Sequence, residues 1–354
     1  MEFTKGKKRI LICPLNWGLG HATRCIPIIN ELIKQGHYIT IAADEGPLKL
    51  LQKEFPGLTF IVFPNYSIRY PSDSNMAVSI LMQSPRIVYS IYKEHKELKK
   101  IIAAHKMDVV ISDNRFGLWN KGVKSIFITH QLFIKTPFAH RFTNAINHWF
   151  IKQYDECWVP DTEGEINLSG ELSHGQKQFS NVKFIGSLSR FNKQENGFEK
   201  KWDVLVILSG PEPQRSIFEN IVLQQLKQTS LKTLIVKGIA SAEEVWEEVN
   251  SNITSVSHLP AKQLETAILS SEIIVSRSGY STIMDLVALG KKAIFVPTPG
   301  QTEQEYLAER FMKTGICFSQ TQQEFNLEMA LKESGKFTGF KNSFDNTGAV
   351  IPIF

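Results

Sequence analysis

The stretch 274–299 gathers small polar side chains, an arginine and a carboxylate in an order that suits a phosphate-bearing ligand. Its apolar start ends at residues 276–279, Ser-Arg-Ser-Gly, and an amphipathic segment follows at once with Ser281-Thr282. This order predicts a strand, a tight turn and a helix N-terminus, whose free N–H groups and partial positive charge attract anions. Asp285 falls on the helix face of Ser281-Thr282 and suits a ribose diol. The stretch predicts a nucleoside-diphosphate pocket.

A second loop with the residues for chemistry follows the apolar run Arg9–Pro14. Gly18 and Gly20 permit close approach of the backbone to a ligand, and His21 stands where the next helix should begin. A positive helix end lowers the pKa of an imidazole and favours a neutral base. The spacing is not the dinucleotide G-x-G-x-x-G, because Thr23 occupies the third position. We favour a reaction-centre role for His21 over a helix cap.

Two more polar side chains stand at the ends of expected strands. Asp113 follows the apolar run Val109–Ser112, and His130 follows Ser125–Thr129. Because the carboxyl ends of parallel strands share one edge of a sheet, either side chain could contact an acceptor hydroxyl or act as the base. For Asp113, a turn or helix cap is an equally good interpretation.

The elements that position these residues alternate between apolar strand runs and amphipathic helical stretches along the whole chain. Such alternation is typical of parallel sheets with helices on both faces. We therefore expect an α/β protein with two doubly wound, Rossmann-like domains facing a cleft. The expected domains are an N-terminal acceptor domain over 1–186, a linker over 187–201 and a C-terminal donor domain over 202–354, whose last residues are candidates to pack back on the first domain.

Two charged runs are interpreted as helix surfaces. The first, Glu94–Lys100, is expected to be a solvated face of the long helix Ala77–His105. The second is expected to be a separate helix over Ala242–Asn250 with its glutamates in water.

Composition narrows the class of protein. The chain has 354 residues, of which 42% are hydrophobic and 21% are charged, with a net charge of +5. Its longest apolar runs are far shorter than the roughly 20 residues that span a bilayer. It has no N-terminal apolar stretch of signal-peptide length, and its four cysteines are scattered without metal-ligand spacing. We expect a cytoplasmic protein with reduced thiols.

The charge is distributed unevenly. Residues 1–160 have 21 basic and 12 acidic side chains, a balance of +9, whereas residues 161–354 have a balance of −4. No nucleic-acid motif accompanies the positive half, so we predict no nucleic-acid partner. The segment Phe138–Lys152 is aromatic and basic at helical spacing, which suits either a membrane-surface face or a buried helix with a polar edge. Peripheral contact with the inner face of the membrane is a hypothesis.

The two glycine-containing loops together resemble those of GT-B glycosyltransferases, in particular the family 28 group that includes lipid-II-forming N-acetylglucosaminyltransferases and monogalactosyldiacylglycerol synthases. The resemblance implies that Gly20-His21 lies near the donor phosphates and the acceptor. It further implies that Asp285 binds the ribose and that the loop 258–260 lies against uracil. Residues and resemblance together give the donor-binding set Gly18, Gly20, Arg190, Ser209, Gly210, Leu259, Arg277, Ser278, Gly279, Thr282, Asp285, Gln304 and Glu305.

The segment Gly18–Cys25 is also similar to a family of sugar-nucleotide hydrolases that carry Gly-x-Gly-His-x-x-Arg-Cys. Three alternatives therefore stay open beside the transferase: a hydrolase in which His21 activates water, a nucleotide-sugar 2-epimerase, and a non-catalytic nucleotide-sugar-binding protein. Conversion of a nucleotide sugar without an acceptor would distinguish the first two from a transferase.

The favoured function is transfer of a sugar from a nucleoside diphosphate sugar, with UDP implied by the resemblance, to an acceptor hydroxyl. His21, Asp113 and His130 are the candidate catalytic residues. No spaced set of carboxylates and histidines suggests a metal, so we expect metal-independent chemistry and no cofactor beyond the nucleotide-sugar substrate. The resemblance implies inversion at the anomeric carbon. The acceptor is unknown, with a lipid or a cell-envelope glycan as candidates.

Overall fold

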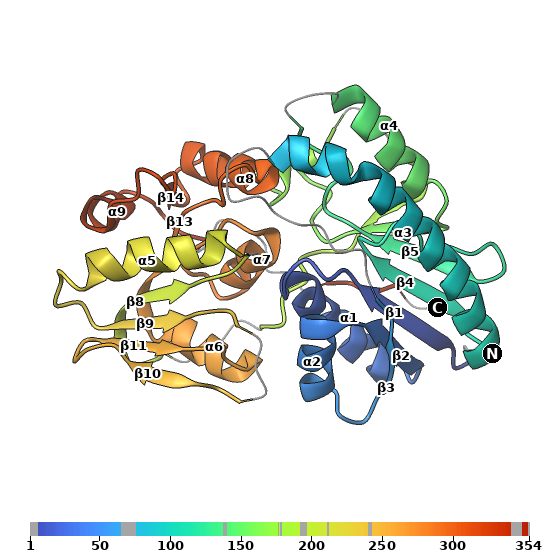
Figure 1. Ribbon diagram of the computed structural model, residues 1–354, viewed down its shortest axis with the longest axis horizontal. Helices are drawn as coiled ribbons and strands as arrows, with labels where there is room; N and C mark the ends of the chain where they lie inside the picture. Colours follow the sequence, from blue (N-terminus) through green and yellow to red (C-terminus); the bar gives the residue numbers. More distant parts are fainter. Residues whose placement is uncertain are drawn as a thin grey trace. The chain divides into compact units, whose positions relative to one another are not determined.

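The computed structural model describes residues 6–64, 76–136, 140–175, 177, 179–191, 197–210, 212–239, 243–340 and 349–352. The described chain forms two compact units, drawn in Figure 1. One unit contains residues up to 64, then 77–188, and the C-terminal residues 349–352; the other contains 189–340. The C-terminal residues are tied to the first unit by a hydrogen bond of 2.8 Å from the Val350 N–H to the Ile185 carbonyl.

In the described residues, the first unit is built on a parallel sheet with the strand order β3-β2-β1-β4-β5-β6-β7. Its strands are β1 (Arg9–Pro14), β2 (Tyr38–Ala43), β3 (Thr59–Val62), β4 (Val109–Asp113), β5 (Lys124–Ile128), β6 (Glu156–Val159) and β7 (Val182–Phe184). The α-helices are α1 (Gly20–Lys34), α2 (Glu45–Glu54), α3 (Met76–His105) and α4 (His140–Ile151). Figure 1 shows α1 and α2 on one side of this sheet and α3 on the other.

The central strands of this sheet are mostly apolar because helices cover both faces. Ile12, Ile111 and Phe127, from β1, β4 and β5, are fully buried. The chain leaves β1 toward β2 in one direction and returns to β4 on the other side of β1. The strand order therefore reverses between β1 and β4, and the crevice outside their carboxyl ends is where doubly wound sheets bind ligands.

The second unit repeats this plan with the strand order β10-β11-β9-β8-β12-β13-β14 in the described residues. Its strands are β8 (Trp202–Ile207), β9 (Thr233–Val236), β10 (Trp246–Glu248), β11 (Ile253–Val256), β12 (Ser271–Ser276), β13 (Ala293–Phe295) and β14 (Phe318–Ser319). Its α-helices are α5 (Gln214–Leu226), α6 (Ala261–Leu269), α7 (Tyr280–Ala288), α8 (Thr302–Lys313) and α9 (Leu327–Ser334). Figure 1 shows α5 and α6 on opposite sides of the sheet. The order reverses between β8 and β12, so this sheet also has a switch point.

The predicted helix over Ala242–Asn250 is wrong. Residues 246–248 form β10, which pairs antiparallel with β11 in the register Trp246↔Val256. The turn between the two strands is closed by Asn250, whose side-chain oxygen accepts the N–H groups of Asn252 and Ile253. The glutamates suggested a solvated helix, but this asparagine turn and the β-favouring pair Val245-Trp246 prevail.

The prediction that Glu94 belongs to a solvated helix face is also wrong. Its side chain is buried and forms an ion pair with Arg115, with 2.7 Å between the Arg115 Nη2 and Glu94 Oε1 atoms. The Arg115 guanidinium also packs over the Phe63 ring. Glu94 lies on the face of α3 that the sheet covers, because Leu98, one turn further along, is fully buried as well.

Candidate functional site

His21 and Asp113 lie in contact at the switch point of the first sheet. Asp113 is the last residue of β4, and His21 is in the first turn of α1, directly after the loop that leaves β1. The His21 Nδ1 and Asp113 Oδ1 atoms are 3.0 Å apart. The carboxylate is fully buried, whereas the imidazole is 14% exposed. The sheet thus brings together two of the three predicted catalytic residues, 92 positions apart.

Arg24, one helical turn after His21, completes this pair. Its Nε donates to Asp113 Oδ2 over 2.6 Å, and its Nη2 donates to Asp113 Oδ1. Its Nη1 lies 3.1 Å from the Nδ1 of His130, the third predicted residue, which follows β5. The sequence analysis noted Arg24 only as part of a motif. Its position at i+3 from His21, on the same helix face, was the signal that could have found it.

The charges in this cluster decide which group can accept a proton. Burial lowers the pKa of His21, and the cation of Arg24 lowers it further, while Asp113 raises it, so the ring is neutral near pH 7. Despite its burial, the Asp113 carboxyl has a pKa well below its usual range because Arg24 and His21 stabilise the anion. A carboxylate this acidic is a poor base, so Asp113 orients His21 and is not itself a good candidate base.

The second unit offers a helix N-terminus at its own switch point. Gly279 is the N-cap of α7 in extended conformation, and no side chain caps this end. A Cβ at Gly279 would meet open space. Thr282 in the first turn is half-buried, whereas Ser278 is buried, and its hydroxyl donates to the Gln304 carbonyl over 2.7 Å. Backbone N–H groups, more than the Ser278 hydroxyl, therefore remain to receive an anion here.

Asp285 is engaged by the segment that begins this unit. The Ser189 hydroxyl donates to Asp285 Oδ1 over 2.8 Å, and the Arg190 Nε atom lies 3.5 Å from Oδ2. Burial raises the pKa of Asp285, although Arg190 opposes that shift. The structure thus brings together two predicted donor-binding residues, Asp285 and Arg190, as an ion pair.

The loop after β13 is shaped by its own polar side chains. Gln304 accepts the N–H of Thr298 over 2.8 Å and donates to the Gln301 side chain over 2.5 Å. Glu305 is exposed and accepts the N–H of Gly300 over 2.8 Å. Both predicted donor-binding residues thus form hydrogen bonds within the loop, Gln304 from a buried position and Glu305 at the surface.

The remaining predicted donor residues lie at strand ends or loop tips. Ser209 and Gly210 follow β8 beside the switch point, with Gly210 at a φ of 97° that other residues rarely adopt. Leu259 is buried just before α6. In the first unit, Gly18 has a φ of 82°, and Gly20 begins α1.

Comparison with known proteins identifies the class. Residues 204–338 match the glycosyltransferase family 28 C-terminal domain. The UDP-N-acetylglucosamine–N-acetylmuramyl-(pentapeptide) pyrophosphoryl-undecaprenol N-acetylglucosamine transferase of Sulfurihydrogenibium sp. is 20% identical over 311 residues, covering 84% of this chain and 81% of that protein. An uncharacterized glycosyltransferase of Methanosarcina mazei is 23% identical over 337 residues, covering 87% and 85%.

The solved structure of the calicheamicin glycosyltransferase CalG4 has the same fold, with a TM-score of 0.63 at 12% identity over 97% of this chain and 95% of that one. The chain is a GT-B glycosyltransferase related to family 28. The expected fold class and enzyme class are confirmed, and the comparisons support none of the three alternatives, hydrolase, epimerase or non-catalytic binding protein.

One predicted donor residue of the glycosyltransferase needs correction. Arg277 is fully buried, with its guanidinium over the Phe218 ring. Its Nη1 donates to the carbonyls of Val296 and Pro297, and its Nη2 donates to the Gln214 carbonyl and the Gln322 side chain. These bonds fasten the loop after β13 to the start of α5. Arg277 therefore supports the loops, and its Nε atom alone has no hydrogen-bond partner within the described residues.

The sequence analysis also missed Thr298. This residue follows β13 and is buried, and its Oγ1 atom has no hydrogen-bond partner within the described part of the glycosyltransferase. A Cβ at Gly210 would lie 3.7 Å from that oxygen, so the loop after β8 and the loop after β13 nearly touch. A buried hydroxyl without a partner marks a point where a ligand could bond. The only sequence signal was its place directly after an apolar strand and a proline.

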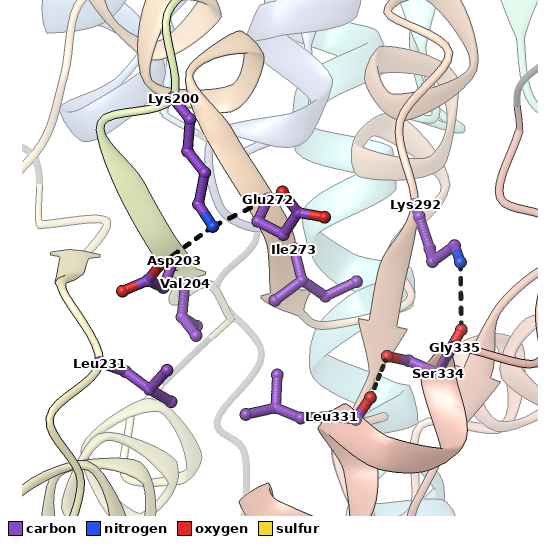
Figure 2. A pocket seen from close by; sticks show the side chains of 10 residues that line it. All are labelled: Lys200, Asp203, Val204, Leu231, Glu272, Ile273, Lys292, Leu331, Ser334 and Gly335. Atoms are coloured by element: carbon purple, nitrogen blue, oxygen red, sulfur yellow. Dashed lines mark hydrogen bonds and ion pairs between the residues drawn. The ribbon is translucent and has the colours of Figure 1, made fainter.

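A cavity of about 340 Å³ lies at the opposite edge of the second sheet, near the amino ends of β8 and β12. Figure 2 shows Lys200 pointing toward Asp203 and Glu272, with nitrogen-to-oxygen distances of 3.0 and 3.7 Å, and Lys292 pointing toward the Ser334 carbonyl. The two lysines and two carboxylates balance in charge. Because doubly wound sheets bind ligands at the carboxyl ends of their strands, this cavity is not the donor pocket of the glycosyltransferase.

The described residues of the glycosyltransferase contain no group of three or more His, Cys, Asp or Glu side chains placed to hold a metal ion. Over the same residues, no helix has both the length and the apolar character needed to cross a bilayer.

Proposed function

We propose that this glycosyltransferase moves a sugar from a UDP-sugar to an acceptor hydroxyl, with His21 as the general base. The observation that carries the proposal is the His21–Asp113 pair at the first switch point. In this proposal the second unit binds the donor and the first unit supplies the base. The relative from Sulfurihydrogenibium, which is named for transfer from UDP-N-acetylglucosamine, supports UDP as the nucleotide.

The pair has the polarity that a base requires. A carboxylate can only accept, so the bonded Nδ1 of His21 carries the proton and Nε2 carries the lone pair. Nε2 takes the proton of the acceptor hydroxyl as that oxygen attacks the anomeric carbon. The bond from that carbon to the diphosphate oxygen breaks, and its electron pair leaves with the diphosphate. Direct displacement of this kind inverts the anomeric centre.

The leaving diphosphate gains charge, which the second unit is built to receive. The uncapped N-terminus of α7 offers N–H groups and the positive end of the helix dipole. Arg190 supplies a cation within the same unit, and the ribose hydroxyls compete with Ser189 for Asp285. We propose that these groups replace a metal ion and that no cofactor takes part.

The acceptor class is inferred from an unusual helix. α4 buries polar residues, Asn144, Asn147 and His148, and exposes an apolar stripe of Phe142, Ile146 and Trp149. Together with the balance of +9 over residues 1–160, this stripe suits the surface of an anionic membrane. We propose a lipid-linked acceptor reached at the inner membrane face, in line with the undecaprenol-linked acceptor in the name of the Sulfurihydrogenibium relative.

The activity is tested by incubating the purified protein with UDP-, GDP- and CMP-sugars, with and without a lipid extract. We expect release of UDP that requires the extract. Release at the same rate without an acceptor would indicate a hydrolase, and interconversion of donors an epimerase; either would overturn the proposal.

The membrane contact has its own test. The protein is expected to float with vesicles that contain anionic lipid at low salt and to dissociate as salt rises. Trp149→Ser should weaken flotation, whereas Trp246→Ser, at the similarly exposed Trp246 of β10, should not. Failure to float at low salt would contradict the contact.

A further inference from the structure

Arg24 connects every ionisable group of the proposed reaction centre. It is 3% exposed, and all three of its nitrogens point at side chains: Nε and Nη2 at Asp113, Nη1 at His130. Asp113 in turn contacts His21 at 3.0 Å and the Cys25 thiol at 3.6 Å. A cation placed this way acts on two imidazoles, one through the carboxylate and one directly.

The hydrogen-bonding capacities of these groups fix where the protons lie. A guanidinium has only donors, so the Nδ1 of His130 must accept from Arg24, which leaves the proton of a neutral ring on Nε2. A carboxylate has only acceptors, so His21 is protonated at Nδ1 and bare at Nε2. The two imidazoles therefore carry opposite tautomers: His21 can take a proton at Nε2, and His130 can give a hydrogen bond there.

We propose that Arg24 is a positioning residue that sets these opposite tautomers, making His21 the base and keeping His130 from acting as one. The inference rests on the proposed function, in which His21 deprotonates the acceptor. It also corrects the prediction of His130 as an alternative base, because its Nε2 already carries a proton.

Charge supports the same division. The ionisable groups that act on His21 are Arg24 from its own helix, Asp113 from β4 and His130 from the segment after β5. Burial and Arg24 lower the pKa of His21, and Asp113 raises it. Arg24 thus keeps the base neutral to lower pH, and the bidentate contact prevents Asp113 from binding a proton itself. Activity should be present above the pKa of His21 and should fall as pH decreases through it.

The first test needs no substrate. Nitrogen-15 NMR of histidine-labelled wild-type protein at pH 7.5 reports which ring nitrogen of each histidine is protonated. We expect His21 at Nδ1 and His130 at Nε2, with His21→Gln and His130→Gln giving the assignments. The same tautomer on both rings, or the reverse arrangement, would overturn the proposal. Because no sugar is involved, this result holds even if the protein proves not to be a transferase.

The second test compares two substitutions of Arg24 by the pH dependence of kcat/KM. Arg24→Gln removes the cation and should move the acidic limb upward by about one pH unit, with His130 losing its fixed tautomer. Arg24→Lys keeps the positive charge but loses the paired donors of the guanidinium. It should therefore lower turnover by roughly tenfold, with the acidic limb of the pH profile near its wild-type position. If Arg24→Gln does not fold, Arg24→Lys decides. Retained tautomers with turnover lowered about tenfold support the proposal, whereas retained tautomers with full turnover contradict it.

A matched control comes from the same unit. Arg115 is also fully buried and paired with a carboxylate, but its side-chain bonds go to Glu94 and to the carbonyls of Phe63 and Pro64, away from His21 and His130. Arg115→Lys should lower the thermal midpoint without moving the acidic limb. If Arg24→Gln and Arg115→Lys change activity only in proportion to the folded fraction, with the limb unmoved in both, Arg24 is a structural ion pair and the proposal fails.

Discussion

Arg24 and Arg277 are two buried arginines in equivalent places with different partners. Each lies just past a switch-point strand, Arg24 in the helix after β1 and Arg277 in the turn after β12. Arg24 bonds a carboxylate and an imidazole, whereas Arg277 bonds three backbone carbonyls and an amide. Both side chains are buried near a switch point, so the partners decide the role. Ionisable partners give Arg24 influence over proton positions, and carbonyl partners make Arg277 a support for loops.

The largest expected effect is on turnover, in the cluster of ionisable groups around Arg24. His21→Ala should lower turnover by about 100- to 10,000-fold, the usual cost of a lost general base, with donor affinity nearly unchanged. Steady-state kinetics and calorimetry with UDP measure the two quantities. If turnover decreases by less than about tenfold, His21 is a residue of the helix N-terminus and not the base. Arg24 would then have no reactive group to act on, and its contrast with Arg277 would be lost.

The Arg277 side predicts a stability effect. Arg277→Met leaves several buried carbonyls without donors and should lower the free energy of unfolding by about 3 kcal/mol, since each unsatisfied group costs about 1–3 kcal/mol. Urea unfolding of the variant and wild type measures it. If the stability is unchanged while the KM for the donor rises more than tenfold, Arg277 is a donor contact after all, and the contrast with Arg24 is lost.

A smaller effect is expected at Asp285, which lies one turn into the helix that follows Arg277. Asp285→Ala removes the proposed acceptor of the ribose hydroxyls and should weaken UDP binding by about 1–3 kcal/mol. Glu272→Ala, on the same strand-and-helix segment but at the far edge of the sheet, is the control and should bind UDP normally. Unchanged UDP affinity in a folded Asp285→Ala protein would contradict the assignment.

The smallest expected effect is that of metal removal. With the diphosphate charge met by α7 and Arg190, a chelator should leave turnover unchanged. Loss of activity with a chelator and its return with magnesium or manganese would show that the second unit needs a cation that these groups do not provide.

Much of the fold could be predicted because its signals are local. The apolar run Arg9–Pro14 was bounded correctly as β1, since a strand buried on both faces is mostly apolar. The helix start after Ser278-Gly279 and the glycine loop before His21 could also be predicted, because turn and cap residues act over a few positions. The failure at β10 came from giving the glutamates more weight than the Asn250 turn and the pair Val245-Trp246, which favour pairing with β11.

The sequence by itself thus determined the class of fold, the two loops that bear chemistry and the placement of His21, Asp113 and His130 at strand ends. Only the tertiary structure decided what those residues meet. Arg24 reaches Asp113 across 89 positions and His130 across 106, and Arg277 reaches carbonyls up to 63 positions away. No local pattern specifies such pairs, because desolvation and long-range packing fix which donor faces which acceptor, and those contacts separate a base from its support.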